Sequence, residues 1–591
     1  MNETATEIPP EWNLDDLYAG PDDAALESDL NEAATRAKAF ASRYAGRLAD
    51  LDGAALGAAI GEYEAIDDIA GRAISYAQLY FAADVGDAER ARFHQTMHER
   101  INAIGTETLF FTLELNRIDD AVLEAQLQTP AAGRYRPWLR DVRSYRPHQL
   151  SDELEKLLYE KSVAGRAAWV RLFEETIAGL RFRIDRQDLA IADVLDMLSD
   201  ADGKVRRKAA KAIGKGLGGE LRLFALITNT LAKDKEIEDQ WRAFAAPVSS
   251  RNLANQVEDE VVEALVGAVR DSFVPLAHRY YKLKAKWFGK RRIDYWDRNA
   301  PLPDDDDTRY AWDEARGLVL DAYGAFAPEM ADVASRFFDR RWIDARLRPG
   351  KDPGAFSHPT VPSAHPYILM NFHGRSRDVM TLAHELGHGV HQVLAADQGG
   401  LMADTPLTTA ETASVFGEML TFRSMLDAET DPKRRRILLA GKVEDMLNTV
   451  VRQVAFHEFE RRVHDERRSG ELSAERLGDI WMDVQVESLG PAIRFDDGYR
   501  SYWTYIPHFV HTPFYVYAYA FGDCLVNSLY DVFESSESGF QAKYFDMLRA
   551  GGTKRHKELL APFGLDASDP AFWKRGLGVI GRFVDELEGM K

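Results

Sequence analysis

The chain contains a single cysteine, Cys524, among its 591 residues. One cysteine cannot form an internal disulfide, so the sequence is typical of a protein that folds in a reducing compartment. Basic residues are also scarce relative to acidic ones, 74 against 95, which gives a formal net charge of −21. Because the lysines and arginines are spread out rather than clustered, we do not expect nucleic-acid binding.

Long apolar runs are missing as well. No uninterrupted stretch approaches the length that a membrane-spanning helix requires. The first residues, Met1 to Thr4, have neither the basic start nor the apolar core of a signal peptide. We therefore expect a cytoplasmic protein that does not associate with membranes. The composition favours no particular oligomeric state.

The most informative motif is the run His384-Glu385-Leu386-Gly387-His388, which has the pattern HExxH. Residues four apart lie on one face of a helix, so the two imidazoles can bind one metal ion. Glu385 lies about 100° around the helix, where a general base beside the metal belongs. Apolar residues, among them Val379, fall on the opposite side and predict a buried face.

A catalytic zinc ion needs three protein ligands and one open position. We predict a second helix over residues 410–418, on which Glu411 and Glu418 lie on one stripe. We expect Glu411 to be the third ligand, and Glu418 to orient a ligand or to replace Glu411 in that role. The alternative is that both are solvated helix carboxylates. His391 lies about 10 Å along the helix from His384, so we expect it to contact substrate or support a ligand instead.

Two short strands are predicted near the motif, at residues 354–357 and 367–372. A strand at a sheet edge beside a metal-binding helix can hold an extended peptide through main-chain hydrogen bonds. We expect Met370 and Asn371 to bind substrate in this way. A small structural hairpin would have the same sequence pattern.

Residues 505–519 are rich in tyrosine and histidine, which can donate hydrogen bonds to a developing oxyanion. Thr512 followed by Pro513 predicts the start of a helix there. On that helix Tyr515 and Tyr519 share a face, whereas Tyr517 points nearly the opposite way. The alternation of tyrosines also fits a strand.

Most of the remaining chain has helical periodicity, and its length allows more than one lobe. The polar, glycine-containing run at residues 199–203 interrupts that pattern. We predict an N-terminal helical lobe over residues 1–200 and a catalytic region over residues 201–591.

These motifs resemble the active site of oligoendopeptidase F, one of the thimet-oligopeptidase-like metallopeptidases. The resemblance spans nearly the whole chain. The segments that carry it are Trp12–Tyr18, Tyr280–Lys284, Tyr295–Asp297, Pro366–Phe372, Gly374, Asp378–His391, Glu411–Ser414, His508–Phe509 and Thr512–Tyr517.

The resemblance implies a mainly α, two-lobed fold with a deep central cleft and a small β-sheet beside the zinc helix. It also implies one Zn²⁺ per chain, short peptides as substrates, and catalytic roles for His508 and one or two tyrosines. Tyr515 and Tyr519 are the favoured tyrosines, and Tyr517 is expected to bind substrate. The predicted enzyme is a zinc metalloendopeptidase in which Glu385 is the general base for a zinc-activated water.

Two alternatives stay open. A zinc carboxypeptidase or dipeptidyl carboxypeptidase on the same fold would need a cationic group for the C-terminus of the substrate, and Arg494 and Arg500 are candidates. A non-catalytic peptide-binding protein is less favoured, because the motif and its acidic partner are complete.

Overall fold

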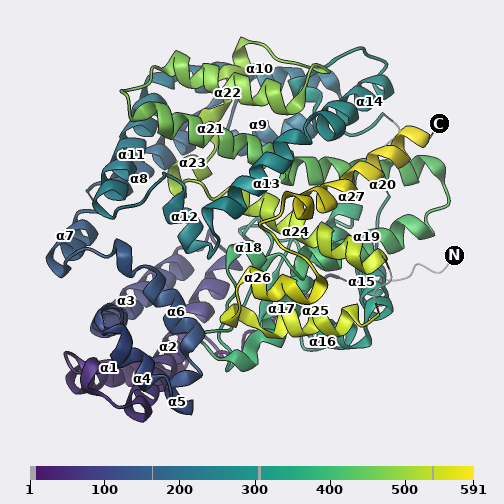
Figure 1. The fold of residues 1–591 in the computed structure, drawn as a ribbon. Coiled ribbons are helices and arrows are strands. Elements are labelled where there is room, and N and C mark those ends of the chain that lie inside the picture. The colour runs from purple at the N-terminus through teal and green to yellow at the C-terminus, as the bar shows by residue number, and fades with distance from the viewer. Residues whose placement is uncertain (1–7, 163, 304–307, 536–537, 591) are drawn as a thin grey trace. The chain divides into compact units, whose positions relative to one another are not determined.

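The computed structural model describes residues 8–162, 164–303, 308–535 and 538–590 (Figure 1). The expectation about Met1 to Thr4 therefore falls outside the described residues. The fold is mainly helical with three small sheets among these residues, which confirms the predicted fold class. The chain divides into two compact units.

Each compact unit is assembled from three separate segments of the chain. Unit 1 comprises Met1–Arg146, Asp307–Ala428 and Ser536–Gly564, and unit 2 comprises Pro147–Asp306, Glu429–Ser535 and Leu565–Lys591. The units therefore alternate along the sequence instead of following one another. The predicted division is a different one, because its two lobes, residues 1–200 and 201–591, follow one another along the sequence. It stays a prediction.

Unit 1 carries the HExxH helix together with the N-terminal helices. Its elements are α1 (Ala24–Tyr44), α2 (Gly53–Ala82), α3 (Ala88–Arg117), α4 (Asp120–Gln126), α5 (Pro130–Gly133), α6 (Arg136–Ser144), α15 (Trp312–Phe326), α16 (Pro328–Asp339), β4 (Ile343–Asp344), β5 (Phe356–His358), β6 (Tyr367–Leu369), α17 (Ser376–Ala395), α18 (Leu407–Ala410), α19 (Ser414–Ala428), α25 (Phe540–Arg549) and α26 (His556–Leu560).

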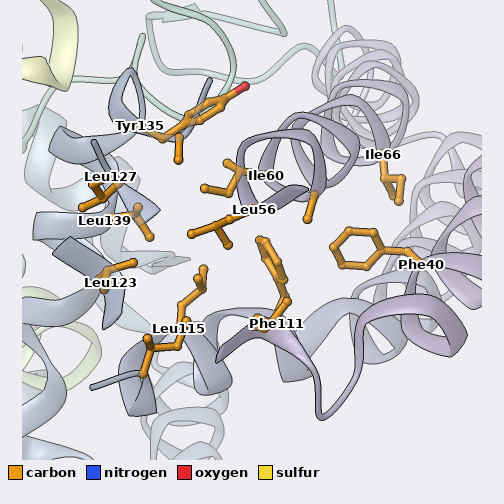
Figure 2. Packing of buried hydrophobic residues seen from close by; sticks show 14 of the residues in the cluster. Phe40, Leu56, Ile60, Ile66, Phe111, Leu115, Leu123, Leu127, Tyr135 and Leu139 are labelled. Atoms are coloured by element: carbon orange, nitrogen blue, oxygen red, sulfur yellow. The ribbon is translucent and has the colours of Figure 1, made fainter. Parts of the chain in front are cut away.

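The N-terminal helices pack around a continuous apolar core (Figure 2). Helices α1, α2 and α3 each begin after an aspartate whose carboxylate accepts a backbone N–H, a typical N-cap. Phe40 and Phe111 are fully buried in this core, and Met402, which follows α17 in the chain, joins it. Gly57 allows α2 to approach α5, because a Cβ there would lie 2.4 Å from the backbone of Ala131.

A three-stranded sheet lies beside α17 in unit 1. Strand β6 is central, with β4 parallel on one side and β5 antiparallel on the other. Both predicted strands therefore exist, but β6 is shorter than predicted, and it is β5 that forms the edge next to α17. Ile368 in β6 donates its N–H to the carbonyl of Trp342, the residue before β4. Its partner in β5 is Ser357, and because Ile368 is bonded on the β4 side, the N–H of Ser357 points away from β6.

Unit 2 contains the C-terminal histidine- and tyrosine-rich segment. Its elements are α7 (Asp152–Ser162), α8 (Arg166–Gly179), β1 (Phe182–Ile184), β2 (Gln187–Leu189), α9 (Ile191–Asp196), α10 (Gly203–Gly219), α11 (Leu221–Trp241), α12 (Ser249–Ala254), α13 (Asp259–Asp271), α14 (Arg279–Trp287), β3 (Ile293–Asp294), α20 (Pro432–Thr449), α21 (Val451–Arg467), α22 (Ala474–Leu489), β7 (Ile493–Arg494), α23 (His508–His511), α24 (Tyr517–Glu534) and α27 (Pro570–Gly589).

Helices α24 and α27 pack closely in unit 2. A Cβ at Gly576 of α27 would lie 2.3 Å from the carbonyl oxygen of Cys524 in α24, so this spacing requires glycine. Cys524 is buried in that contact. Across the described residues, no helix combines the length and the apolar character needed to cross a membrane.

Candidate active site

Helix α17 presents the HExxH motif on a well-defined face. The carboxylate of Asp378 in its first turn accepts the backbone N–H groups of His373 and Arg375, each at 2.9 Å, and so caps the helix start. The apolar face is fully buried, as the amphipathic pattern predicted. The histidines of the motif lie on the other face.

His384 and His388 meet Glu411 in unit 1. Glu411 Oε2 lies 3.3 Å from His384 Nε2 and 3.5 Å from His388 Nε2. One potential ligand atom from each of the three residues falls within 4.8 Å of the others, the arrangement that could hold a metal ion. Two imidazole nitrogens and one carboxylate oxygen are a donor set that suits zinc.

Glu411 does not lie on a continuous helix, so the predicted helix over residues 410–418 is wrong in this respect. It occupies a turn between α18 and α19. The hydroxyl of Thr412 donates to the carbonyl of Thr409 at 2.6 Å, and such local side-chain bonds compete with helical ones. The hydroxyl of Ser414 donates to Glu411 Oε2 at 2.6 Å and fixes the carboxylate. This role of Ser414 was not predicted from the sequence, although its position three residues after Glu411 was a signal.

Glycines allow the two ligand-bearing segments to approach. A Cβ at Gly387, inside the motif, would lie 2.4 Å from the carbonyl oxygen of Ala413 and 2.6 Å from Cα of Ser414. On α15, Tyr323 donates its hydroxyl to the carbonyl of Ala383 at 2.5 Å. Helix α17 is therefore held from two sides immediately around His384 and His388.

Glu418 lies behind His384. Its Oε2 is 3.2 Å from His384 Nδ1, which leaves Nε2 facing Glu411. Burial alone would lower the pKa of His384, but the hydrogen bond that its ring donates to Glu418 and the charges of Glu411 and Glu385 outweigh it and raise the pKa to about 9. The arrangement is the one in which a carboxylate orients a metal-binding histidine.

Glu385 is almost fully buried beside these residues, with 6% of its surface exposed. Burial raises its pKa to about 7, the nearby charge of His384 opposes this, and the backbone N–H of Ser357 in β5 bonds to the carboxylate. The edge strand β5 and the glutamate of the motif are therefore in direct contact.

Three residues of unit 1 were predicted to contact substrate, and each of them has its own surroundings. Met370 is fully buried, and its backbone carbonyl accepts a hydrogen bond from the ammonium group of Lys351 at 2.6 Å. Asn371 donates to the carbonyl of Asp352 at 2.9 Å. His391 is buried, and burial lowers its pKa to about 4. Their predicted substrate contacts stay predictions, and the burial of Met370 does not favour its role.

In unit 2, the structure brings together His508, Tyr515 and Tyr519. The ring of His508 stacks on Tyr515 with centroids 5.8 Å apart, and His508 Nε2 lies 3.4 Å from the hydroxyl of Tyr519. The rings of the two tyrosines are 5.3 Å apart. The three residues that were predicted to form one catalytic group are therefore neighbours.

The predicted helix start at residues 512–513 is wrong. Helix α24 begins at Tyr517, and Phe514 has a positive φ of 60° that interrupts helical geometry. The carboxylate of Glu460 in α21 accepts the N–H of Phe514 at 2.8 Å and stabilises this turn. Tyr517 does point away from its neighbours, as predicted; it is fully buried, and its hydroxyl accepts a hydrogen bond from Asn255. This burial does not favour contact with substrate.

Comparison with curated proteins finds relatives along most of the chain. Oligopeptidase PepF of Bacillus subtilis is 26% identical and matches 98% of this chain and 86% of its own length. An oligoendopeptidase F homolog of Borreliella burgdorferi is 24% identical, with 89% of each chain covered.

Solved structures share the fold. A Chlamydophila abortus protein superimposes with a TM-score of 0.87 at 22% identity and covers 99% of this chain and all of its own. Oligoendopeptidase-F of Enterococcus faecium gives 0.73 at 21% identity, with coverage of 96% and 98%.

Two family models match the sequence. The model described as Oligopeptidase F matches residues 114–182, and the model described as Peptidase family M3 matches residues 196–579. The second match covers well over half of the chain and confirms the resemblance drawn from the motifs. This protein is therefore a peptidase and belongs to the metal-dependent peptidases of family M3.

Proposed function

We propose that this peptidase hydrolyses short peptides as a zinc metalloendopeptidase, with one Zn²⁺ held by His384, His388 and Glu411. One observation carries the proposal: the ligand atoms of these three residues converge, and Glu418 supports His384 from behind. The names of the relatives, oligopeptidase and oligoendopeptidase, support short peptides as the substrate class.

The proposed catalytic residues divide the chemistry between them. When bound, zinc would supply a Lewis acid that lowers the pKa of water and polarises the peptide carbonyl. Glu385 takes the proton from the attacking water and delivers it to the leaving amine. His508 with Tyr519 or Tyr515 donates hydrogen bonds to the oxyanion of the tetrahedral intermediate.

The substitution Glu385→Gln tests the proposed mechanism. It preserves size and removes the proton acceptor, so we expect cleavage of an internally quenched peptide to fall by about 10²–10⁴-fold. Zinc content should stay near one ion per chain, since Glu385 is not a proposed ligand. Equal rates for wild type and variant would exclude Glu385 as the general base.

The substitution Tyr519→Phe tests the oxyanion donor. Removal of one such donor lowers kcat by about 10²–10³-fold. Tyr515→Phe is the matched variant, because the two rings are neighbours and only one hydroxyl is needed. A full kcat in both variants would leave His508 as the donor.

We also infer a cytoplasmic location for this activity. The single cysteine supports it, since a chain without disulfides is typical of a reducing compartment. Cell fractionation with antibodies against the protein measures this directly, and recovery in the culture medium would contradict it.

A further inference from the structure

Two arginines of unit 2 lack an acidic partner. Among the described residues, neither Arg298 nor Arg452 lies in an ion pair with a carboxylate, whereas many arginines of the chain do. Arg298 follows a short turn, Tyr295–Asp297, and Arg452 lies in the first turn of α21. Arg298 Nη1 and Arg452 Nε are buried atoms without a hydrogen-bond partner. Leaving a charged group in this state costs free energy.

The surroundings of the pair neutralise it only in part. Burial would lower the pKa of Arg298, but nearby tyrosines and then Glu444 outweigh it and raise that pKa. The guanidinium of Arg452 lies over the ring of Phe456, 4.8 Å from its centre. Burial, and then the charge of Arg298, lower the pKa of Arg452, so the two cations are close enough to repel each other. The nearby carboxylate of Glu444 is already bonded to the ammonium group of Lys284 at 2.6 Å.

Tyrosines complete the environment. Tyr499 and Tyr505 both interact electrostatically with the two arginines, and Tyr505 also bonds to Arg452. Both arginine side chains are half-buried instead of fully enclosed. A planar guanidinium binds a carboxylate through two parallel hydrogen bonds, and two guanidiniums with phenol donors suit an anion of that size.

This cationic pair lies near the residues proposed to stabilise the oxyanion. The ring of Phe456, under the guanidinium of Arg452, lies 5.5 Å from the ring of Phe509, the residue after His508. Burial, then the charges of His511 and Arg452, lower the pKa of His508. By contrast, the arginines that the sequence suggested for this role are occupied. Arg494 is paired with Asp294, and Arg500 is paired with Asp479.

We propose that Arg298 and Arg452 bind the C-terminal carboxylate of the peptide substrate. This inference rests on the proposed function, because it assumes that His508 acts on the same peptide. Binding of that carboxylate adds a charge-assisted contact that only a peptide with a free C-terminus can make. The pair therefore selects short peptides by their free C-terminus, a property that an endopeptidase or a dipeptidyl carboxypeptidase could share.

The first experiment needs only the wild-type protein loaded with zinc. One peptide sequence is supplied as the free acid and as the C-terminal amide, and kcat and KM are measured for both. Loss of charge-assisted hydrogen bonds should raise KM for the amide by about 10- to 100-fold. Equal KM values would overturn the proposal while leaving peptide hydrolysis, and hence the proposed function, intact.

Variants then assign the preference to residues. Arg452→Gln and Arg298→Gln should remove the preference for the free acid, and Arg452→Lys should keep part of it. The matched control is Arg500→Gln, a surface arginine of the same unit, which should keep the full preference. A preference that survives both glutamine variants, in protein whose circular dichroism is unchanged, would overturn the assignment.

A carboxylate could also come from a side chain of the substrate. Replacing each internal Glu or Asp of the test peptide by Gln or Asn distinguishes the two sources. We expect the KM of the free acid to be unchanged by these replacements. A rise in KM that follows an internal carboxylate instead of the C-terminus would contradict the proposal.

Discussion

A methyl group added to the HExxH motif provides a sharp test of how the site is built. In Gly387→Ala, the new Cβ would lie 2.4 Å from the Ala413 carbonyl oxygen, whereas ordinary contacts begin at 3.4 Å. It would also lie 2.6 Å from Cα of Ser414. Both neighbours are backbone atoms, so neither can rotate away. The start of α19 must move away from α17 by several tenths of an ångström or more.

Two opposing terms set the effect on stability. Replacement of glycine by alanine inside a helix stabilises by about 1 kcal/mol. Overpacking of a close contact destabilises by about 1–3 kcal/mol, and the backbone contacts of Gly387 place it in the upper part of that range. We therefore expect a net loss of about 1–2 kcal/mol in the free energy of unfolding.

The effect on the metal site should be larger than the effect on stability suggests. Metal–ligand distances tolerate changes of only about 0.2 Å, and Glu411 is two residues before Ala413. Zinc affinity should fall on the order of 10- to 100-fold, as when groups supporting a ligand are lost. Competition with a chromogenic chelator measures the affinity, and urea unfolding measures the stability.

The matched control is Gly105→Ala in α3 of the same unit. A Cβ at Gly105 meets nothing within 4 Å, so this variant should gain up to about 1 kcal/mol and bind zinc normally. If Gly387→Ala were stabilised to the same extent and kept its zinc affinity, the close approach of α17 and α19 would not be the constraint inferred above.

Two further predictions concern unit 2. Burial raises the pKa of Glu460 from 4.5 to about 8, so its contribution to stability is complete below pH 4.5 and is lost as the pH rises toward 8. The free energy of unfolding of the wild type, measured with urea, should fall over that interval by up to about 1.4 kcal/mol per pH unit relative to Glu460→Gln, which keeps an acceptor for the N–H of Phe514. Parallel pH profiles of the two proteins would contradict this. Tyr517→Phe removes the bond from Asn255 and should cost about 0.5–1.5 kcal/mol of stability with KM unchanged. A raised KM at unchanged stability would instead support the substrate role predicted from the sequence.

The metal-binding helix was predictable because its information is local. Residues four apart share a helix face, so His384 and His388 had to converge once α17 formed. Glu411 could be proposed as their partner from the sequence. Its position in a turn could not be predicted. That turn depends on the hydroxyl of Thr412 and on the approach of Gly387 to Ala413, and the second is a tertiary contact.

The tyrosine-rich segment shows the same limit. Thr512 and Pro513 have the local pattern of a helix start, yet α24 begins later. The positive φ of Phe514 is stabilised by Glu460, which lies 54 residues away in the sequence. The arginines are a second case: a sequence identifies guanidinium groups but not which of them find carboxylates. Arg298 became distinctive only when its partners, or their absence, were known.

The interleaving of the two units has a consequence for synthesis. Unit 1 receives its last segment, residues 536–564, only after most of unit 2 has left the ribosome. That segment contributes α25, which packs on α17, and the hydroxyl of Tyr544 bonds to the carbonyl of Thr412 beside Glu411. The nascent chain therefore exposes an unfinished metal site and part of its apolar support through much of translation. Chaperone binding to this intermediate, and aggregation of chains that stop before residue 536, are the expected costs of such an architecture.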